Sequence, residues 1–195
     1  MSTELKDGGP ETTRRRQGGF TLVELLIVVI ILGIIAAIVV PQLSTSTSDA
    51  KMSALDSDLA RLRSAVDLYY QQHGHYPGNA AASGATCPSG GTAGAGTIAD
   101  AANRGTSFAE QLTMYTNAAG QACSTTDTTF RYGPYLKAAT LGAAGLPKNP
   151  FTDSRAVSVV TSGNLVMASA STTGGWLYDA TIGKLIADHQ DYDDR

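Results

Sequence analysis

The chain has few of the residues from which enzyme sites are built. Its 195 residues include two cysteines, three histidines and one tryptophan. His73 and His75 fall at the end of a predicted helix and His189 in a tail, and no serine stands in a nucleophile-elbow setting. We therefore expect a protein that is not an enzyme.

An excess of positive charge is also missing. The chain carries 14 Lys and Arg against 17 Asp and Glu, a formal net charge of −3. No basic patch of the kind that binds nucleic acid is evident in the sequence, so nucleic acid is not indicated as a partner. The length suits one small domain beside any targeting or membrane segment.

One long apolar run is present, and it contains a single charge, Glu24. The run from Phe20 to Val40 would span about 31 Å as a helix, close to the thickness of the hydrocarbon core of a bilayer. An ionised group at that depth costs about 3 kcal/mol on insertion scales, so Glu24 is a functional candidate. We expect its partner to be a cation made after synthesis.

The polar residues before the run indicate how that cation arises. Residues 1–19 carry Arg14, Arg15 and Arg16 and end in Gly18-Gly19. In a secretory signal the small-residue cleavage site follows the apolar stretch, whereas here it precedes it. Cleavage after Gly19 would keep the apolar helix, and the arginines would hold the leader in the cytoplasm. It would also create an amine on Phe20, one helical turn from Glu24.

The string from Gly19 to Ile38, GFTLVELLIVVIILGIIAAI, continues to Pro41 and resembles the type IV pilin-like family of pilins and type II secretion pseudopilins. The resemblance implies that a prepilin peptidase cuts between Gly19 and Phe20 and N-methylates Phe20. It implies a homopolymer built through this helix, drawn from the inner membrane by an assembly platform with minor pilins or pseudopilins. The protein would cross the inner membrane once with its head in the periplasm, then enter a periplasmic or extracellular filament.

Within such a filament Glu24 would act as a register device. A mismatched register leaves both Glu24 and the Phe20 amine unpaired, which costs several kcal/mol. The alternative is that Glu24 extends to the membrane surface and does nothing more. Gly33 would allow close helix packing or local melting, and Pro41 would kink or interrupt the helix.

Residues 41–77 are predicted to continue the helix as an amphipathic segment that ends near Gly74. Its charged residues suit a solvent-facing side. Its apolar positions recur at steps of three and four, the spacing of one helical face: Met52, Leu55, Leu59, Leu62, Val66 and Tyr69. We expect this stripe to pack on the protein's own sheet rather than in an independent coiled coil.

Residues 78–127 are predicted to be a loop with one short helix. Residues 78–106 are mostly Ala, Gly, Ser and Thr, which bury little surface. Ser107 to Glu110 has the form of a capping box and predicts a helix over 108–116.

Cys87 and Cys123 flank this segment. In an exported head they would form a disulfide that closes a loop of about 37 residues and contributes up to about 4 kcal/mol. Free thiols and a zinc site with His73 and His75 are the alternatives; the spacings match no usual zinc module.

Residues 128–195 are predicted to form a small antiparallel sheet and an acidic tail. The β-favouring runs are 128–136, 156–161, 164–170 and 175–188. A hairpin turn is expected at Ser162-Gly163 and a longer turn from Asp179 to Gly183. The fold class is therefore α+β and pilin-like, with a long helix, apolar then amphipathic, packed on this sheet.

Two features resemble major type II secretion pseudopilins. Residues 133–137 and 146–151 resemble their glycine-tyrosine and proline-rich connection, although Asn149 to Thr152 replaces the usual Asp-Pro-Trp-Gly. The resemblance implies a calcium site in the acidic tail, with Ca²⁺ as cofactor and Asp188, Asp191 and Asp193 as candidate ligands. The alternative is a solvated tail that binds no cofactor.

The sequence as a whole predicts a filament subunit, with a major type II secretion pseudopilin favoured. A type IV pilus subunit for adhesion, motility or DNA uptake is the alternative. A membrane-anchored binding protein or enzyme that does not polymerise is the hypothesis from a different class.

Overall fold

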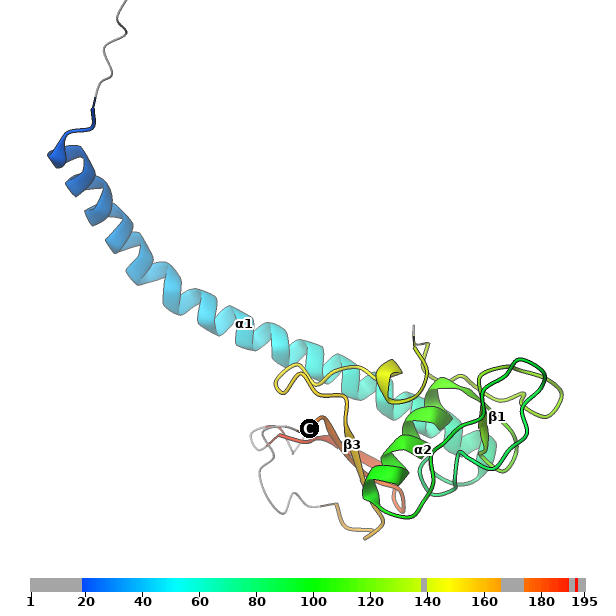
Figure 1. Ribbon diagram of the computed structural model, residues 1–195. Helices are drawn as coiled ribbons and strands as arrows, with labels where there is room; N and C mark the ends of the chain where they lie inside the picture. Colours follow the sequence, from blue (N-terminus) through cyan, green and yellow to red (C-terminus); the bar gives the residue numbers. More distant parts are fainter. Residues whose placement is uncertain (1–18, 138–139, 166–173, 190–191, 193–195) are drawn as a thin grey trace, which may run out of the picture. The chain divides into compact units, whose positions relative to one another are not determined.

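The computed structural model describes residues 19–137, 140–165, 174–189 and 192. The predicted leader, apart from Gly19, lies outside them. The chain divides between Ser46 and Thr47 into two compact units, and Figure 1 shows the order of their elements. The α+β, pilin-like class is confirmed: a long N-terminal helix is followed by a shorter helix and small sheets.

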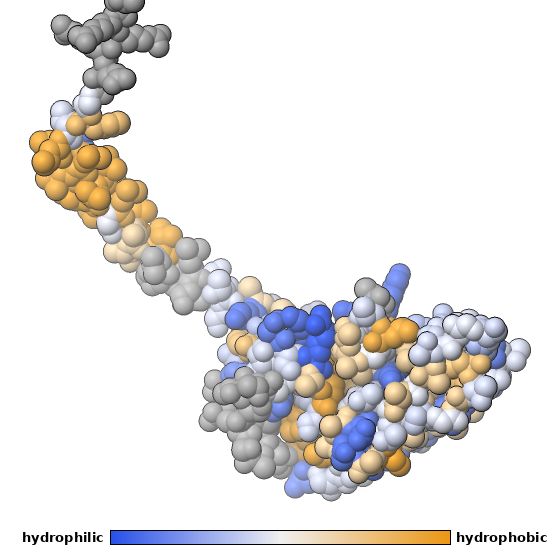
Figure 2. All heavy atoms as spheres, viewed as in Figure 1, coloured by the Kyte–Doolittle hydropathy of each residue, from blue (hydrophilic) through white to orange (hydrophobic). Residues whose placement is uncertain are grey.

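Helix α1 (Leu22–His73) begins in the first unit. Its backbone is helical through Pro41, so this proline does not end the helix. Figure 2 shows the hydrophobic side chains that cover this part of α1 in the view drawn. They are exposed along its length, from 79% at Leu22 to 41% at Val39. No described residue of the first unit covers them.

The second unit, Thr47–Arg195, is called the head. Within it five of the six residues of the predicted stripe on α1 are buried, with Leu55, Leu59, Leu62, Val66 and Tyr69 at most 1% exposed, and Met52 is half-buried. The helix ends at His73 because Gly74 adopts a φ of +72° and donates its N–H to the Tyr70 carbonyl at 2.8 Å. Burial of the stripe from Leu55 to Tyr69 and the end of the helix near Gly74 are thus confirmed.

The stripe packs into one core with α2 (Ala101–Thr113) and the main sheet. Trp176, Tyr178 and Phe108 are its largest aromatic members beside Tyr69, and the Phe108 and Tyr178 rings lie 4.6 Å apart. A Cβ at Gly105 would overlap the carbonyl oxygen of Val157, so the backbones of α2 and β3 lie in direct contact. The stripe is therefore covered by the protein's own head.

The main sheet has the order β3 (Val157–Val160), β4 (Trp176–Asp179), β5 (Lys184–Ala187). The β4–β5 pair is antiparallel, and the predicted turn from Asp179 to Gly183 joins it. The β3–β4 pair is parallel, so the prediction of a wholly antiparallel sheet is wrong there. Ser162-Gly163 forms a bend after β3. It is not a hairpin turn between β3 and β4, because these two strands are parallel. Of the predicted 164–170 strand, Asn164 and Leu165 lie outside any strand and the rest lies outside the described residues.

The predicted strand over 128–136 is also wrong. Only an isolated bridge between Thr116 and Tyr132 forms there, beside a two-stranded sheet of β1 (Tyr115–Thr116) and β2 (Ala122–Cys123). Gly133 has a φ of +76° and Pro134 has no N–H to donate, so the ladder cannot continue. A short 3₁₀ helix, η1 (Gly142–Gly145), precedes β3.

Helix α2 starts seven residues before the predicted helix and ends at Thr113. Its N-cap is Asp100, whose carboxylate accepts from the Asn103 N–H at 2.8 Å, and not Ser107. Ser107 and Glu110 lie inside the helix, where their side chains face the preceding loop. The prediction of a capping box at this position is wrong, because the N-cap Asp100 stands about two helical turns earlier.

Three side chains of α2 hold the loop before it. Buried Gln111 accepts from the Gly78 N–H at 2.7 Å and donates to the carbonyls of Ala80 and Gly120 at 3.0 and 2.8 Å. Glu110 accepts from the N–H groups of Ala95 and Gly96. Ser107 accepts from the Ala82 N–H and donates to the Thr97 carbonyl. A segment with little apolar surface is thus held through its backbone.

Cys87 and Cys123 form a disulfide, with Cα atoms 5.8 Å apart. It ties the loop to β2. The expected pairing is confirmed, and the alternatives of free thiols or zinc-bound cysteines are wrong for this structure.

Candidate processing and assembly segment

The predicted cleavage junction lies just before the start of α1. Gly19 and Phe20 are both exposed, Phe20 by 83%, and α1 begins at Leu22. A Cβ added at Gly19 would meet no atom within 4 Å. The fold of the described residues therefore places no demand on glycine at this position.

Thr21 and Glu24 form a capping box at the start of α1. The Glu24 N–H donates to the Thr21 hydroxyl at 3.2 Å, and the Thr21 N–H donates to Glu24 Oε2 at 2.9 Å. The Thr21 hydroxyl also donates a hydrogen bond to Glu24 Oε2 at 2.9 Å. Each residue thus satisfies a backbone N–H of the other that the helix leaves without a partner.

Sequence reasoning missed this interaction, although the signal was present. Thr21-Leu22-Val23-Glu24 is a Thr-x-x-Glu string directly before an apolar run. Both hydrogen bonds to the carboxylate use Oε2, and among the described residues Oε1 accepts none. The carboxylate therefore has a local partner and keeps one oxygen for a further donor.

Among the described residues, one helical segment, Leu22–Val39, is long and apolar enough to cross a membrane, and none of it is buried within the protein. Burying apolar surface is worth about 25 cal/mol per Å². A helix this apolar is stable only where lipid or other protein covers it.

The candidate metal ligands are only partly described. Asp188 is half-buried directly after β5, while Asp191 and Asp193 lie outside the described residues. Within the described part of the chain, no group of three His, Cys, Asp or Glu residues is placed to hold a metal ion.

The predicted zinc ligand His73 is engaged in hydrogen bonds. Its Nε2 lies 3.0 Å from both the Thr116 hydroxyl and the Tyr135 hydroxyl, and its ring stacks on Tyr69 at 4.1 Å. Burial lowers the pKa of His73, the Ala118 backbone acts in the opposite direction, and His75 lowers the pKa further. His73 thus joins the end of α1 to the segments around β1 and Tyr135.

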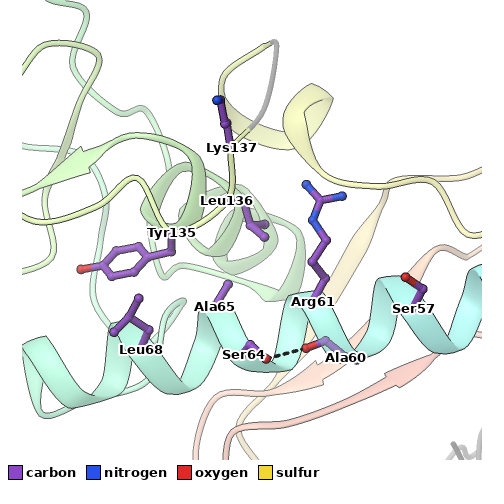
Figure 3. A pocket seen from close by; sticks show the side chains of 9 residues that line it. All are labelled: Ser57, Ala60, Arg61, Ser64, Ala65, Leu68, Tyr135, Leu136 and Lys137. Atoms are coloured by element: carbon purple, nitrogen blue, oxygen red, sulfur yellow. Dashed lines mark hydrogen bonds between the residues drawn. The ribbon is translucent and has the colours of Figure 1, made fainter.

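The head also carries a groove of about 530 Å³ beside α1 (Figure 3). One wall is α1 between Ser57 and Leu68, and the other is the segment of Tyr135, Leu136 and Lys137. The groove holds no constellation of catalytic side chains.

Comparison with known proteins places the functional segment at the N-terminus. Residues 14–40 match the family model described as the prokaryotic N-terminal methylation motif. This is the signal segment of type IV pilins and pseudopilins. The matched residues include the Gly19-Phe20 junction and the Thr21–Glu24 capping box described above. Comparison with the curated proteins and with solved structures found no match. The motif is that of chains that a prepilin peptidase processes and that assemble into filaments.

Proposed function

We propose that this chain is a non-enzymatic structural subunit of a type IV pilus-like filament. The observation that carries the proposal is the methylation motif at residues 14–40, joined to an apolar helix that none of the described residues buries. Lipid can cover this helix before assembly, and the same helix of other copies can cover it afterwards. Glu24 and the amine of Phe20 would set the register between copies.

Among such filaments we favour a major pseudopilin of a type II secretion system, which supports export of folded proteins. The support is the resemblance of residues 133–137 and 146–151 to the connection found in major pseudopilins. Tyr135 of that segment donates to the Gln72 side chain at 2.8 Å and so fixes the connection to α1. Ca²⁺ binding by Asp188, Asp191 and Asp193 belongs to the same proposal, and a rise in melting temperature on adding Ca²⁺ tests it.

A type IV pilus subunit is the second candidate. The disulfide does not decide between the two candidates, because pilins that use a disulfide commonly tie down their C-terminal region with it. The Cys87–Cys123 bond instead fixes the middle loop.

Filament formation tests the proposal. Cells that produce the chain with a prepilin peptidase and an assembly platform should yield filaments of this subunit in sheared fractions, visible by electron microscopy. The matched control is Gly19→Lys, which should stay in the membrane as precursor because cleavage is blocked. A processed chain that never polymerises would instead identify a membrane-anchored binding protein or enzyme.

Deleting the gene then separates the two filament types. Loss of the pseudopilin should leave folded export substrates in the periplasm while surface pili remain. Loss of a pilus subunit should remove surface filaments and the adhesion, motility or DNA uptake that depends on them.

A further inference from the structure

We propose that the groove between α1 and residues 135–137 binds the acidic C-terminal residues of a second copy of this chain. The inference rests on the proposed function, because it needs copies held side by side in a membrane or a filament. It assigns an interaction surface on the head, separate from the N-terminal segment.

The groove has the shape for a short extended segment. Its volume of about 530 Å³ lies within the range of ligand pockets. The small side chains of Ser57, Ala60 and Ser64 line it along α1, and Leu68, 44% exposed, adds apolar surface. A chain can therefore approach the helix closely there.

The rim of the groove is positive. Arg61 and Lys137 are exposed, and Figure 3 shows both side chains rising on the same side of the groove, away from the axis of α1. Neither forms an ion pair with a residue that the structure describes. Asp58, which interacts electrostatically with Arg61, is half-buried, so the cations dominate the exposed rim.

The chain itself carries a complementary segment. Four of the seven residues from 188 to 194 are aspartates: Asp188, Asp191, Asp193 and Asp194. The Tyr192 ring stacks on Phe151 at 4.2 Å, which fixes Tyr192 on its own head, and Asp193 and Asp194 follow it in the sequence.

Geometry favours the groove of another copy over the segment's own. Lys51 lies over the Phe151 ring at 5.8 Å, on the same stack as Tyr192. Arg61 is ten residues further along α1, about 15 Å along the helix axis. The two residues after Tyr192 extend about 7 Å at most. Lys51 therefore lies beside Tyr192 in the same copy, whereas Arg61 lies further along α1 than the backbone of the two residues after Tyr192 extends.

Exposed ion pairs are individually weak and are screened by salt. A contact of this kind forms appreciably only at the high effective concentration of a shared membrane or polymer. It would therefore align neighbouring heads after the N-terminal helices have brought the copies together.

Zero-length crosslinking tests the inference directly. An equal mixture of ¹⁴N- and ¹⁵N-labelled chains is treated with a carbodiimide, which joins lysine amines to nearby carboxylates, both in vesicles and in any filaments formed. We expect peptides that join Lys137 to Asp193 or Asp194 with mixed labels. Lys148 and Asp153, 2.7 Å apart, provide the control of a crosslink with a single label.

The outcomes separate this inference from the proposed function. Mixed-label crosslinks in vesicles, together with an absence of filaments in cells that also produce the prepilin peptidase and the assembly platform, would uphold the groove and refute the filament. Filaments in which the tail couples only to Lys51 with a single label, or not at all to Lys137, would overturn the groove and leave the filament. The absence of mixed-label Lys137 crosslinks in both preparations overturns the groove regardless of filament formation.

Charge exchange provides a second test. The double variant Arg61→Glu, Lys137→Glu should lower the yield of mixed-label crosslinked dimer at least fivefold. This yield is measured with a photocrosslinker that reacts with neither lysines nor carboxylates, so that the substitutions do not change the crosslinking chemistry. Adding Asp193→Lys and Asp194→Lys should restore the yield. Because Arg61 and Lys137 are exposed, far-UV circular dichroism should be unchanged. A quadruple variant that stays at the level of the double variant would contradict the pairing.

Discussion

Glu24 accepts two hydrogen bonds from Thr21, one from the backbone N–H and one from the hydroxyl, both at 2.9 Å. The carboxylate therefore has a structural role at the start of α1 within a single chain. Assembly would give it a second role, with the amine of Phe20. Substitutions that separate these two roles test the register mechanism most sharply.

Glu24→Gln should keep the capping box, because glutamine also serves at this helix position, but it removes the charge. Glu24→Leu removes both. We expect both variants to insert in the membrane with an intact head and to reduce filament yield about tenfold or more, because a buried amine is left unpaired. Sheared fractions measure the yield, and membrane fractionation is the control. Normal assembly of Glu24→Gln beside failure of Glu24→Leu would assign the role to the cap alone.

Processing should remove residues 1–19. Mass spectrometry of the mature protein should find an N-terminal, methylated Phe20. Gly19→Lys should accumulate as precursor, and because a Cβ at Gly19 meets no atom within 4 Å, the folded head should be unaffected. An intact leader in assembled material would refute this prediction.

The disulfide should stabilise the head by about 2–4 kcal/mol, the range for a closed loop of this length. Reduction should lower the melting temperature of the parent but not that of a Cys87→Ser, Cys123→Ser double variant, whose stability should already be lower. Peptide mapping should show one intrachain Cys87–Cys123 link. Two alkylated thiols in native protein would contradict it.

Gln111→Leu should cost about 3 kcal/mol of unfolding free energy. The change leaves the Gly78 N–H and the Ala80 and Gly120 carbonyls without their partner in a buried setting. Gln71→Leu, the same change at an exposed position of α1, should stay within about 0.5 kcal/mol of the parent. Urea denaturation measures both, and equal stability of the two variants would show that the loop does not depend on Gln111.

The head should lose stability as the pH falls below neutrality. The pKa of His73 is lowered in the fold, so the unfolded chain, with an ordinary pKa of 6.5, binds the proton more readily. The contribution of neutral His73 to the free energy of unfolding is therefore fully present above pH 6.5 and decreases as the pH falls below that value. Urea midpoints at pH 7.5 and 5.5 measure the effect, and His73→Gln should reduce the difference. An unchanged difference in that variant would exclude His73 as its source.

Periodicity was sufficient to predict the long helix. The stripe from Leu55 to Tyr69 repeats at one spacing, and Gly74 marks its end, so local sequence carried the information. The pairing of Cys87 with Cys123 was also within reach, because the chain has no other cysteine.

The sheet was harder to predict because pairing depends on distant residues. The β-favouring run before Leu136 forms only a bridge, since Gly133-Pro134 stops the ladder. Whether β3 runs parallel or antiparallel to β4 depends on contacts between residues far apart in the sequence, which local propensity does not report. At the candidate site the Thr-x-x-Glu pattern of Thr21 and Glu24 indicates a helix cap. The charge of Glu24 within an apolar run indicated only a partner in assembly, so its role as a cap was not predicted.

Side chains of helix α2 hold the loop of residues 78–100 by hydrogen bonds to the backbone of the loop, which do not depend on the identity of the loop's side chains. The exceptions are positions such as Gly94 and Gly96, where a Cβ would collide with neighbouring atoms. Buried Ala82, disulfide-bonded Cys87 and the N-cap residue Asp100 are further exceptions, whereas the exposed side chains of this loop are not required by the fold. The loop is therefore the part of the head whose chemical surface natural selection can rewrite most freely while the scaffold beneath it stays the same.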